Sequence, residues 1–131
     1  MAMSALATAD SLKYYFTASS VATRPSARQV ALHTAYPGVN GANNEVTGGT
    51  YARQTATFTV DETNPSAPFA KNSALVTFPA AATGFTVTHI SIHAVGGNCL
   101  AVMRLVADKV IGAGAQAQFA IGEIIIGGTP Q

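Results

Sequence analysis

The chain has 131 residues, of which 48% are apolar and only 10% are charged, and its formal net charge is +1. This length suits one hydrophobic core without disulfides or metal, so we predict a single domain over residues 1–131. Low charge leaves little electrostatic repulsion between copies. It therefore favours an obligate assembly component over a small uncharged monomer.

Several classes of partner and compartment are disfavoured by the same composition. The seven Lys and Arg residues are scattered singly, so the chain has no basic stripe for nucleic acid. The single cysteine, Cys99, has apolar neighbours and reads as a buried thiol in a protein made in a reducing cytoplasm. The N-terminus lacks a signal-peptide pattern, and no stretch approaches the roughly 18 to 20 apolar residues of a membrane span.

The N-terminal region is predicted as an arm over residues 1–26. Apolar residues recur at helical spacing over residues 4–17, which favours a short amphipathic helix. Residues 14–17 are also good strand formers, so an extended arm is the alternative. Residues 19–26, which contain Pro25, read as a linker into the rest of the domain, residues 27–131.

The remainder of the chain alternates between strand-like runs and turn signals. Pro65 and Pro68 mark a loop over residues 61–68, and the residues Gly96, Gly97 and Asn98 mark a hairpin. Strands are predicted over residues 28–33, 51–60, 73–78, 86–94, 99–106 and 116–126, with the last bent or bulged at Gly122. Short strands at this spacing, without crossover helices, predict an all-β antiparallel β-sandwich or jelly roll.

Residues 86–94 place Ile90 and Ile92 on one strand face and His89 and His93 on the other. One buried and one wet face is the simplest account, which makes these histidines surface or interface residues. Four residues of strand span about 13 Å, too far for His89 and His93 to bind one metal ion. The phenylalanines of the strand regions are expected in the core: Phe58, Phe78, Phe85 and Phe119.

Catalytic patterns are missing from the sequence. The adjacent acids Asp61 and Glu62 point to opposite sides of an extended chain, so they form no carboxylate pair. There is no nucleophile elbow, and the glycine pairs lack the lysine and helix context of a phosphate loop. We therefore predict no catalytic, metal or cofactor site.

Residues 32–54, LHTAYPGVNGANNEVTGGTYARQ, form the most distinctive segment. Its glycines and asparagines predict a backbone that turns repeatedly. We expect His33 to order the segment through a backbone carbonyl, Arg53 to pair with Glu45, and Tyr36 to contact a neighbouring molecule.

This segment, together with NSALVTFP (residues 72–79) and VTHISI (residues 87–92), resembles a family of small tailed-bacteriophage virion proteins labelled capsid decoration (cement) or tail-fibre-like proteins. The chain departs from the pattern in an extra residue at the Asn43-Asn44 doublet and in a missing tryptophan before the third block. The resemblance implies a non-enzymatic β-sandwich on the capsid or in the tail.

Our first hypothesis is a capsid cement protein on the capsid exterior, made in the bacterial host cytoplasm. Its expected partners are the major capsid protein and copies of itself, as a dimer or trimer, with no nucleic acid and no membrane. The alternative is a tail or tail-fibre module that binds a host-surface glycan. The candidate interface residues are Tyr14, Tyr15, Tyr36, Pro37, Asn43, Asn44, Glu45, Tyr51, Arg53 and Phe69.

Overall fold

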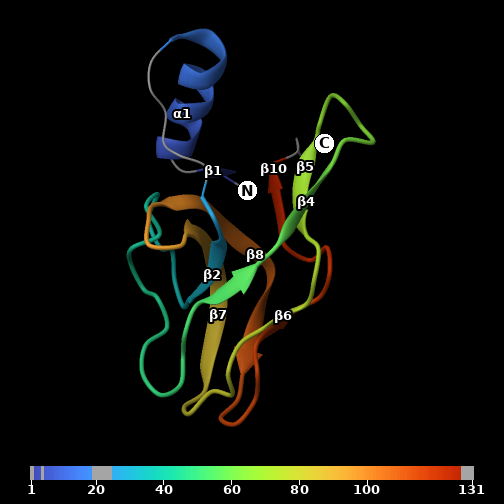
Figure 1. The fold of residues 1–131 in the computed structure, drawn as a ribbon. Coiled ribbons are helices and arrows are strands. Elements are labelled where there is room, and N and C mark those ends of the chain that lie inside the picture. The colour runs from blue at the N-terminus through green and yellow to red at the C-terminus, as the bar shows by residue number, and fades with distance from the viewer. Residues whose placement is uncertain (1, 4, 19–24, 128–131) are drawn as a thin grey trace.

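A computed structural model describes residues 2–3, 5–18 and 25–127. It contains one short helix, α1 (Ala5–Phe16), near the N-terminus, and every strand pair in it is antiparallel. The predicted all-β antiparallel class and the short N-terminal helix are both confirmed (Figure 1). The predicted linker over residues 19–26 lies mostly outside the described residues.

The main sheet has five strands in the order β1-β8-β7-β2-β3. Its strands are β1 (Ala2–Met3), β2 (Arg28–His33), β3 (Gln54–Ala56), β7 (Phe85–Ala94) and β8 (Cys99–Ile111). β7 and β8 form the predicted hairpin, in which Gly96 takes a φ of 68° that favours glycine. In the neighbouring β2–β7 pair, Leu32 lies opposite Ile90 and Val30 opposite Ile92.

Two smaller sheets complete the fold. One has the order β10-β5-β4, and the other pairs β6 with β9. Their strands are β4 (Phe58–Asp61), β5 (Phe69–Asn72), β6 (Val76–Thr77), β9 (Gln118–Phe119) and β10 (Ile125–Gly127).

The prediction of one strand over residues 51–60 is wrong, because the chain changes sheets at Thr57. Ala56 ends β3 in the main sheet, and Phe58 begins β4 in the three-stranded sheet. The Thr57 carbonyl accepts a hydrogen bond from Ser73 N at 2.9 Å, and the two hydroxyls lie 2.6 Å apart. This contact holds the crossing point. It also joins residue 57 to the end of β5, a strand that the sequence did not predict.

Two further strands have boundaries that differ from the predicted ones, for identifiable reasons. β8 continues to Ile111 instead of residue 106, because its pairing with β7 shifts between His89↔Arg104 and Val87↔Lys109, which accommodates a bulge. The strand predicted over residues 116–126 is divided into β9 and β10, with Gly122 at a φ of 78° in the turn between them. The predicted bend at Gly122 is thus confirmed.

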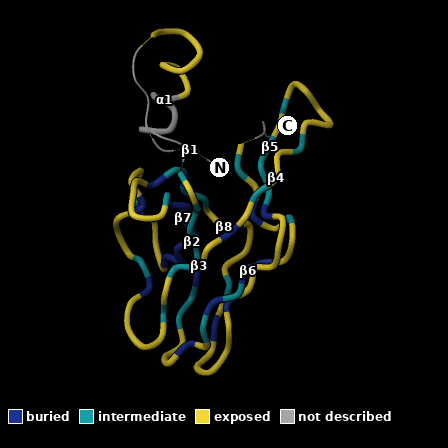
Figure 2. Tube along the Cα trace, in the orientation of Figure 1, coloured by how far each residue is buried: buried dark blue, intermediate teal, exposed yellow. Residues whose placement is uncertain are grey.

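The hydrophobic core lies on one face of the main sheet. Phe78 and Phe119 are 2% and 0% exposed and meet edge to face, with ring centroids 6.3 Å apart. Phe58 and Phe85 are half-buried against the same cluster, so the core placement of all four phenylalanines is confirmed. Burying one such side chain contributes about 1.5 to 3 kcal/mol. Figure 2 shows the exposed segments at the turns and along the described part of α1.

Asn72 at the end of β5 is a fully buried polar residue that holds the turn between β9 and β10. Its side-chain Nδ2 donates to the carbonyls of Ala74 and Ala120, and its Oδ1 accepts from Ile124 N, all at 2.9 Å. Its backbone also bonds to Ile124 and Gly122. Because every bond goes to backbone, this one side chain replaces a stretch of sheet ladder.

We predict that Asn72→Ala lowers the free energy of unfolding by about 2 to 4 kcal/mol, because it leaves several buried backbone groups without a partner. Urea unfolding of both proteins measures the loss. Asn98→Ala is the matched control, since Asn98 is exposed in the hairpin turn, and we expect it to change stability by less than about 0.5 kcal/mol. Equal stability of the two variants would contradict this role for Asn72.

Candidate functional site

The glycine-rich segment folds back as a flap, defined here as residues 34–53. Its first half lies over the face of the main sheet opposite the core, whereas Val46 and Tyr51 in its second half pack against the core. As predicted, its backbone turns repeatedly: Gly38, Gly41, Gly48 and Gly49 all have positive φ. Asn44, within the doublet that departs from the family pattern, also has a φ of 60°, and its side chain donates to Tyr36 O at 2.9 Å. Asparagine tolerates this left-handed conformation.

The flap packs tightly against the sheet at Gly41, which is buried. A Cβ at this position would lie 2.9 Å from Cys99 Sγ and 3.0 Å from both His93 Nε2 and Ser91 Cβ. Its φ of 61° independently disfavours an L side chain. Only glycine fits here, so the sequence of the flap is matched to the sheet beneath it.

Beneath Gly41 lies a chain of hydrogen bonds that links the flap to β2 and β7. His33 Nδ1 lies 2.8 Å from Asn43 O, His33 Nε2 lies 2.7 Å from Ser91 Oγ, and Ser91 Oγ lies 2.8 Å from His93 Nε2. A carbonyl can only accept, so His33 Nδ1 carries a hydrogen. In the neutral ring Nε2 then accepts from the Ser91 hydroxyl, whose oxygen accepts from His93 Nε2–H.

This network confirms one prediction and corrects another. His33 does order the flap through a backbone carbonyl, as expected. His93 is only 5% exposed, so its assignment to the surface is wrong. The strand alternation was read correctly, but the flap covers the face that was expected to be wet. His89 on the same face is half-buried, with the ring of Tyr36 against it at 5.8 Å between centroids.

Both buried histidines are neutral near pH 7. Burial lowers the pKa of His93 to about 4, and the positive charge of Arg53 lowers it further in the same direction. Burial also lowers the pKa of His33, against the opposing effects of the Asn43 carbonyl and the Glu45 carboxylate. The hydrogen-bond directions given above are therefore those of the neutral rings.

A serine between two imidazoles has the residue types of a nucleophile and its base, but the geometry does not allow catalysis. Ser91 is 0% exposed and lies directly under Gly41. A nucleophile needs access to its substrate. The network therefore holds the flap on the sheet.

The second anchor of the flap is a cluster formed by Glu45, Tyr51 and Arg53. Arg53 Nε and Nη2 donate to the two Glu45 oxygens at 2.9 and 2.8 Å, which confirms the predicted ion pair. The Tyr51 hydroxyl donates to Glu45 Oε2 at 2.7 Å and accepts from Leu32 N at 3.0 Å. A two-point arginine–carboxylate pair fixes orientation as well as distance.

The ionisation of this cluster follows from its contacts. Burial opposes ionisation of Glu45, but the hydrogen bonds from Arg53 and Tyr51 bring its pKa below the ordinary value. Burial, and then the hydrogen bond to Glu45, raise the pKa of Tyr51. Glu45 is thus charged and Tyr51 neutral at physiological pH.

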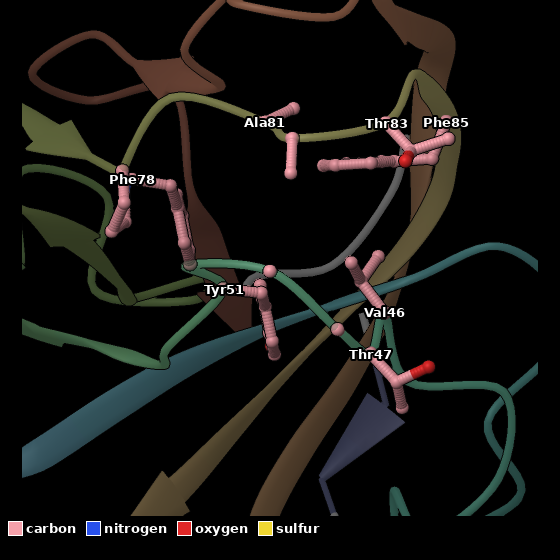
Figure 3. A pocket seen from close by; sticks show the side chains of 11 residues that line it. Val46, Thr47, Tyr51, Phe78, Ala81, Thr83 and Phe85 are labelled. Carbon is pink, nitrogen blue, oxygen red and sulfur yellow. The ribbon is translucent and has the colours of Figure 1, made fainter.

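A small apolar cavity of about 80 Å³ separates the end of the flap from the loop that leads into β7 (Figure 3). Val46, Tyr51, Phe78 and Phe85 line it, and Tyr51 stacks on Phe78 with ring centroids 6.3 Å apart. Ligand pockets usually enclose about 300 to 1,000 Å³. This cavity is therefore a packing gap.

A larger depression of about 430 Å³, which is wide open to solvent and is called the polar cavity below, is lined by the flap and the β7–β8 hairpin. Asn40 and Arg53 line it from the flap, and His93, Asn98 and Cys99 line it from the sheet. Cys99 is 6% exposed, which confirms the predicted buried thiol, and burial raises its pKa. The sequence indicated no such cavity, because its flap and sheet residues lie 40 to 59 positions apart along the chain.

The candidate interface residues lie in different environments. Tyr14, Tyr15, Tyr36, Asn43 and Asn44 are exposed, on α1 and on the flap. Pro37 is fully buried, and Phe69 is half-buried, with Lys71 Nζ 6.0 Å from its ring centroid. Glu45, Tyr51 and Arg53 bond to one another and hold the flap. An interface role remains a prediction for all ten residues.

Across residues 2–3, 5–18 and 25–127, no three His, Cys, Asp or Glu side chains gather where they could hold a metal ion. Within the same residues, α1 and any other helical segment are too short or too polar to cross a bilayer.

The fold and the flap define a small antiparallel β protein with a glycine-rich flap packed on its main sheet. The family model described as "Podophage GP4 fiber I protein gp80" matches residues 2–127. The chain belongs to this family and is a structural component of a bacteriophage virion, of the fibre type. No curated protein matches the sequence. The resemblance to phage virion proteins is confirmed at this level, and the family name supports the tail-fibre hypothesis better than capsid decoration.

We predict that Glu45→Gln destabilises the protein by about 1 to 2 kcal/mol, because it removes the charge from a half-buried two-point pair with Arg53. Chemical denaturation measures the change. Glu62→Gln, on an exposed loop, is the control and should be neutral. If both variants unfold at the same denaturant concentration as the native chain, the pair does not hold the flap.

The buried histidines predict a loss of stability in mild acid. Well above pH 6.5, His93 is neutral in both the folded and the unfolded chain. Between pH 6.5 and about 4 only the unfolded chain gains the proton, so the free energy of unfolding falls, by about 3 kcal/mol in total for this group.

Thermal unfolding between pH 7 and 5.5 measures this dependence. Glu45 and Glu123 have lowered pKa values, so their stabilising contribution is lost only as the pH falls below about 5.5, toward and past their unfolded value of 4.5. The range above pH 5.5 therefore separates the histidine contribution from theirs. His93→Gln should flatten the pH dependence of the midpoint. An identical slope in the variant would show that His93 is not the source.

Proposed function

We propose that this chain is a non-enzymatic structural subunit of a bacteriophage tail fibre and that it assembles with copies of itself. The observation that carries the proposal is the family match over residues 2–127. Two exposed apolar surfaces on the described residues, one on α1 and one on β8, support self-assembly.

The first surface is the C-terminal half of α1. Leu12, Tyr14, Tyr15 and Phe16 are 56%, 68%, 76% and 78% exposed. Isolated helices of 12 residues are marginal in water, and an aromatic cluster of this kind is characteristic of interfaces. Figure 1 shows α1 at one end of the molecule, where it approaches β8, and these four exposed side chains are available to other copies.

The second surface is on β8. Val106 and Val110 are 108% and 80% exposed. Among the described residues, β1 covers the outer edge of β8 only at Ala101 and Val102, so the backbone beyond Val102 has no strand partner on that side. An apolar side-chain pair beside an unpaired strand edge is a favourable site for another chain.

The capsid cement hypothesis makes a different prediction about copy number. A cement protein that binds the major capsid protein is needed in a copy number close to that of the major capsid protein. A fibre subunit is needed only in the few copies that build each fibre, so its copy number per virion is low. We expect quantitative mass spectrometry of purified virions to give the low number. A number near that of the major capsid protein would instead support decoration of the shell.

We predict that the double variant Tyr15→Ser/Phe16→Ser lowers the oligomeric mass of the isolated chain, because it removes two exposed aromatic anchors. Light scattering after gel filtration measures the mass. The thermal midpoint of the sheets should not change, since these side chains lie outside the core.

Val39→Ser is the matched control, as Val39 is 60% exposed on the flap, and it should leave the mass unchanged. An oligomer that survives the double variant would exclude α1 as the contact.

Recognition of a host-surface glycan is the second candidate function for the same fibre component. The polar cavity is the observation that favours it, because the cavity is large enough for a small ligand and lies beside the exposed flap.

A further inference from the structure

We infer that the polar cavity between the flap and the β7–β8 hairpin binds one ring of a neutral sugar. The inference rests on the glycan-recognition function proposed above, to which it adds the site and the ligand class. Its volume of about 430 Å³ lies within the usual range of small-ligand pockets.

The walls of the cavity are held in place before any ligand arrives. On the flap side, Gly41 is packed against Ser91 and Cys99, and Arg53 is held by both Glu45 oxygens. On the sheet side, the hairpin turn is closed by Ala94 N donating to Asn98 O at 2.9 Å and Gly97 N donating to Ala94 O at 3.0 Å. Fixed walls reduce the entropic cost of binding.

The cavity carries hydrogen-bonding groups without an uncompensated charge. The positive charge of Arg53 is paired with Glu45 at 2.8 Å, and the imidazole of His93 is neutral near pH 7. Arg53 uses Nε and Nη2 for this pair, which leaves its Nη1 donors for a ligand. This balance favours a neutral polar ligand over an anion.

His93 contributes an acceptor. Its Nε2 donates to Ser91, so the neutral ring has a lone pair on Nδ1. No described residue bonds to that nitrogen, and no buried side-chain nitrogen or oxygen in the described residues lacks a partner. Nδ1 is therefore not completely buried, and because His93 lines the cavity, we assign this nitrogen as the acceptor for a ligand hydroxyl.

Asn40 on the flap and Asn98 on the hairpin both line the cavity, and both residues are exposed. An amide presents a donor and an acceptor side by side, which suits neighbouring hydroxyls of a sugar ring. The lining includes no aromatic side chain, so binding by hydrogen bonds alone should be weak, with a Kd on the order of 1 mM. Repeated copies in a fibre would raise the avidity.

The test is a nuclear magnetic resonance titration of the full ¹⁵N-labelled chain with glucose, galactose, mannose, N-acetylglucosamine and rhamnose in turn. We expect at least one sugar to shift the side-chain amide signals of Asn40 and Asn98 and the ring signals of His93, with saturation. Inorganic phosphate should shift none of them. If no sugar in the panel shifts these signals, or if phosphate alone does, the inference is wrong.

Variants locate the binding. Asn40→Ala and Asn98→Ala should each weaken binding about tenfold, the effect expected from losing one or two hydrogen bonds. Asn43→Ala is the matched control: an exposed flap asparagine outside the cavity lining, it should bind as the native chain does. Unchanged affinity in both cavity variants would overturn the assignment.

Measuring virion adsorption to host cells distinguishes failure of the sugar site from failure of the proposed host-glycan recognition. If the chain binds sugar but virions carrying Asn98→Ala adsorb normally to host cells, the site stands and host-glycan recognition fails. If the sugar does not bind, the oligomeric mass and the copy number still test the structural role independently.

Discussion

The position of the flap, the hydrogen-bond chain beneath it and the polar cavity all depend on the close contact between the Gly41 backbone and the buried polar face of the main sheet. Gly41 sits within 3.0 Å, measured from an added Cβ, of Ser91, His93 and Cys99. At this distance the sheet groups beneath lose water and must bond to one another, which accounts for the His33–Ser91–His93 chain. The same contact builds one wall of the polar cavity. A larger residue at position 41 would lift the flap and open both features.

The two faces of the main sheet are both covered, whereas apolar side chains on α1 and β8 are exposed. One sheet face holds the apolar core, with Phe78 and Phe119 at its centre. The opposite face is satisfied by internal polar bonds and covered by the flap. The aromatic end of α1 and the valines of β8 have no such cover among the described residues, and a chain with a net charge of +1 offers little repulsion to copies that would bury them. This distribution suits a subunit of a fibre.

Local chemistry made much of the fold predictable. Strand-rich runs between Gly, Pro and Asn turns predicted the antiparallel class, and Gly96 and Gly122 marked turns that the structure contains. The hydrogen bond of His33 and the ion pair of Arg53 were also predictable from the sequence, because their partners Asn43 and Glu45 lie within 10 residues along the chain. The break in the predicted strand at Thr57 was not predictable, because a chain that crosses between sheets retains its strand-like composition on both sides. Nothing local marked Asn72, whose partners lie as far as residue 124.

The sequence by itself determined the antiparallel β class, the flap with its turning backbone, the buried Cys99 and the phage-family resemblance. Each of these depends on residue type or on short-range spacing, which is present before folding. Only the tertiary structure decided that the histidine face is covered, that Pro37 is buried, and that Asn40 and Asn98 face one cavity. These outcomes depend on which surface the flap lies against. Long-range packing fixes that choice, because the strand alternation that separates two faces does not state what covers either one.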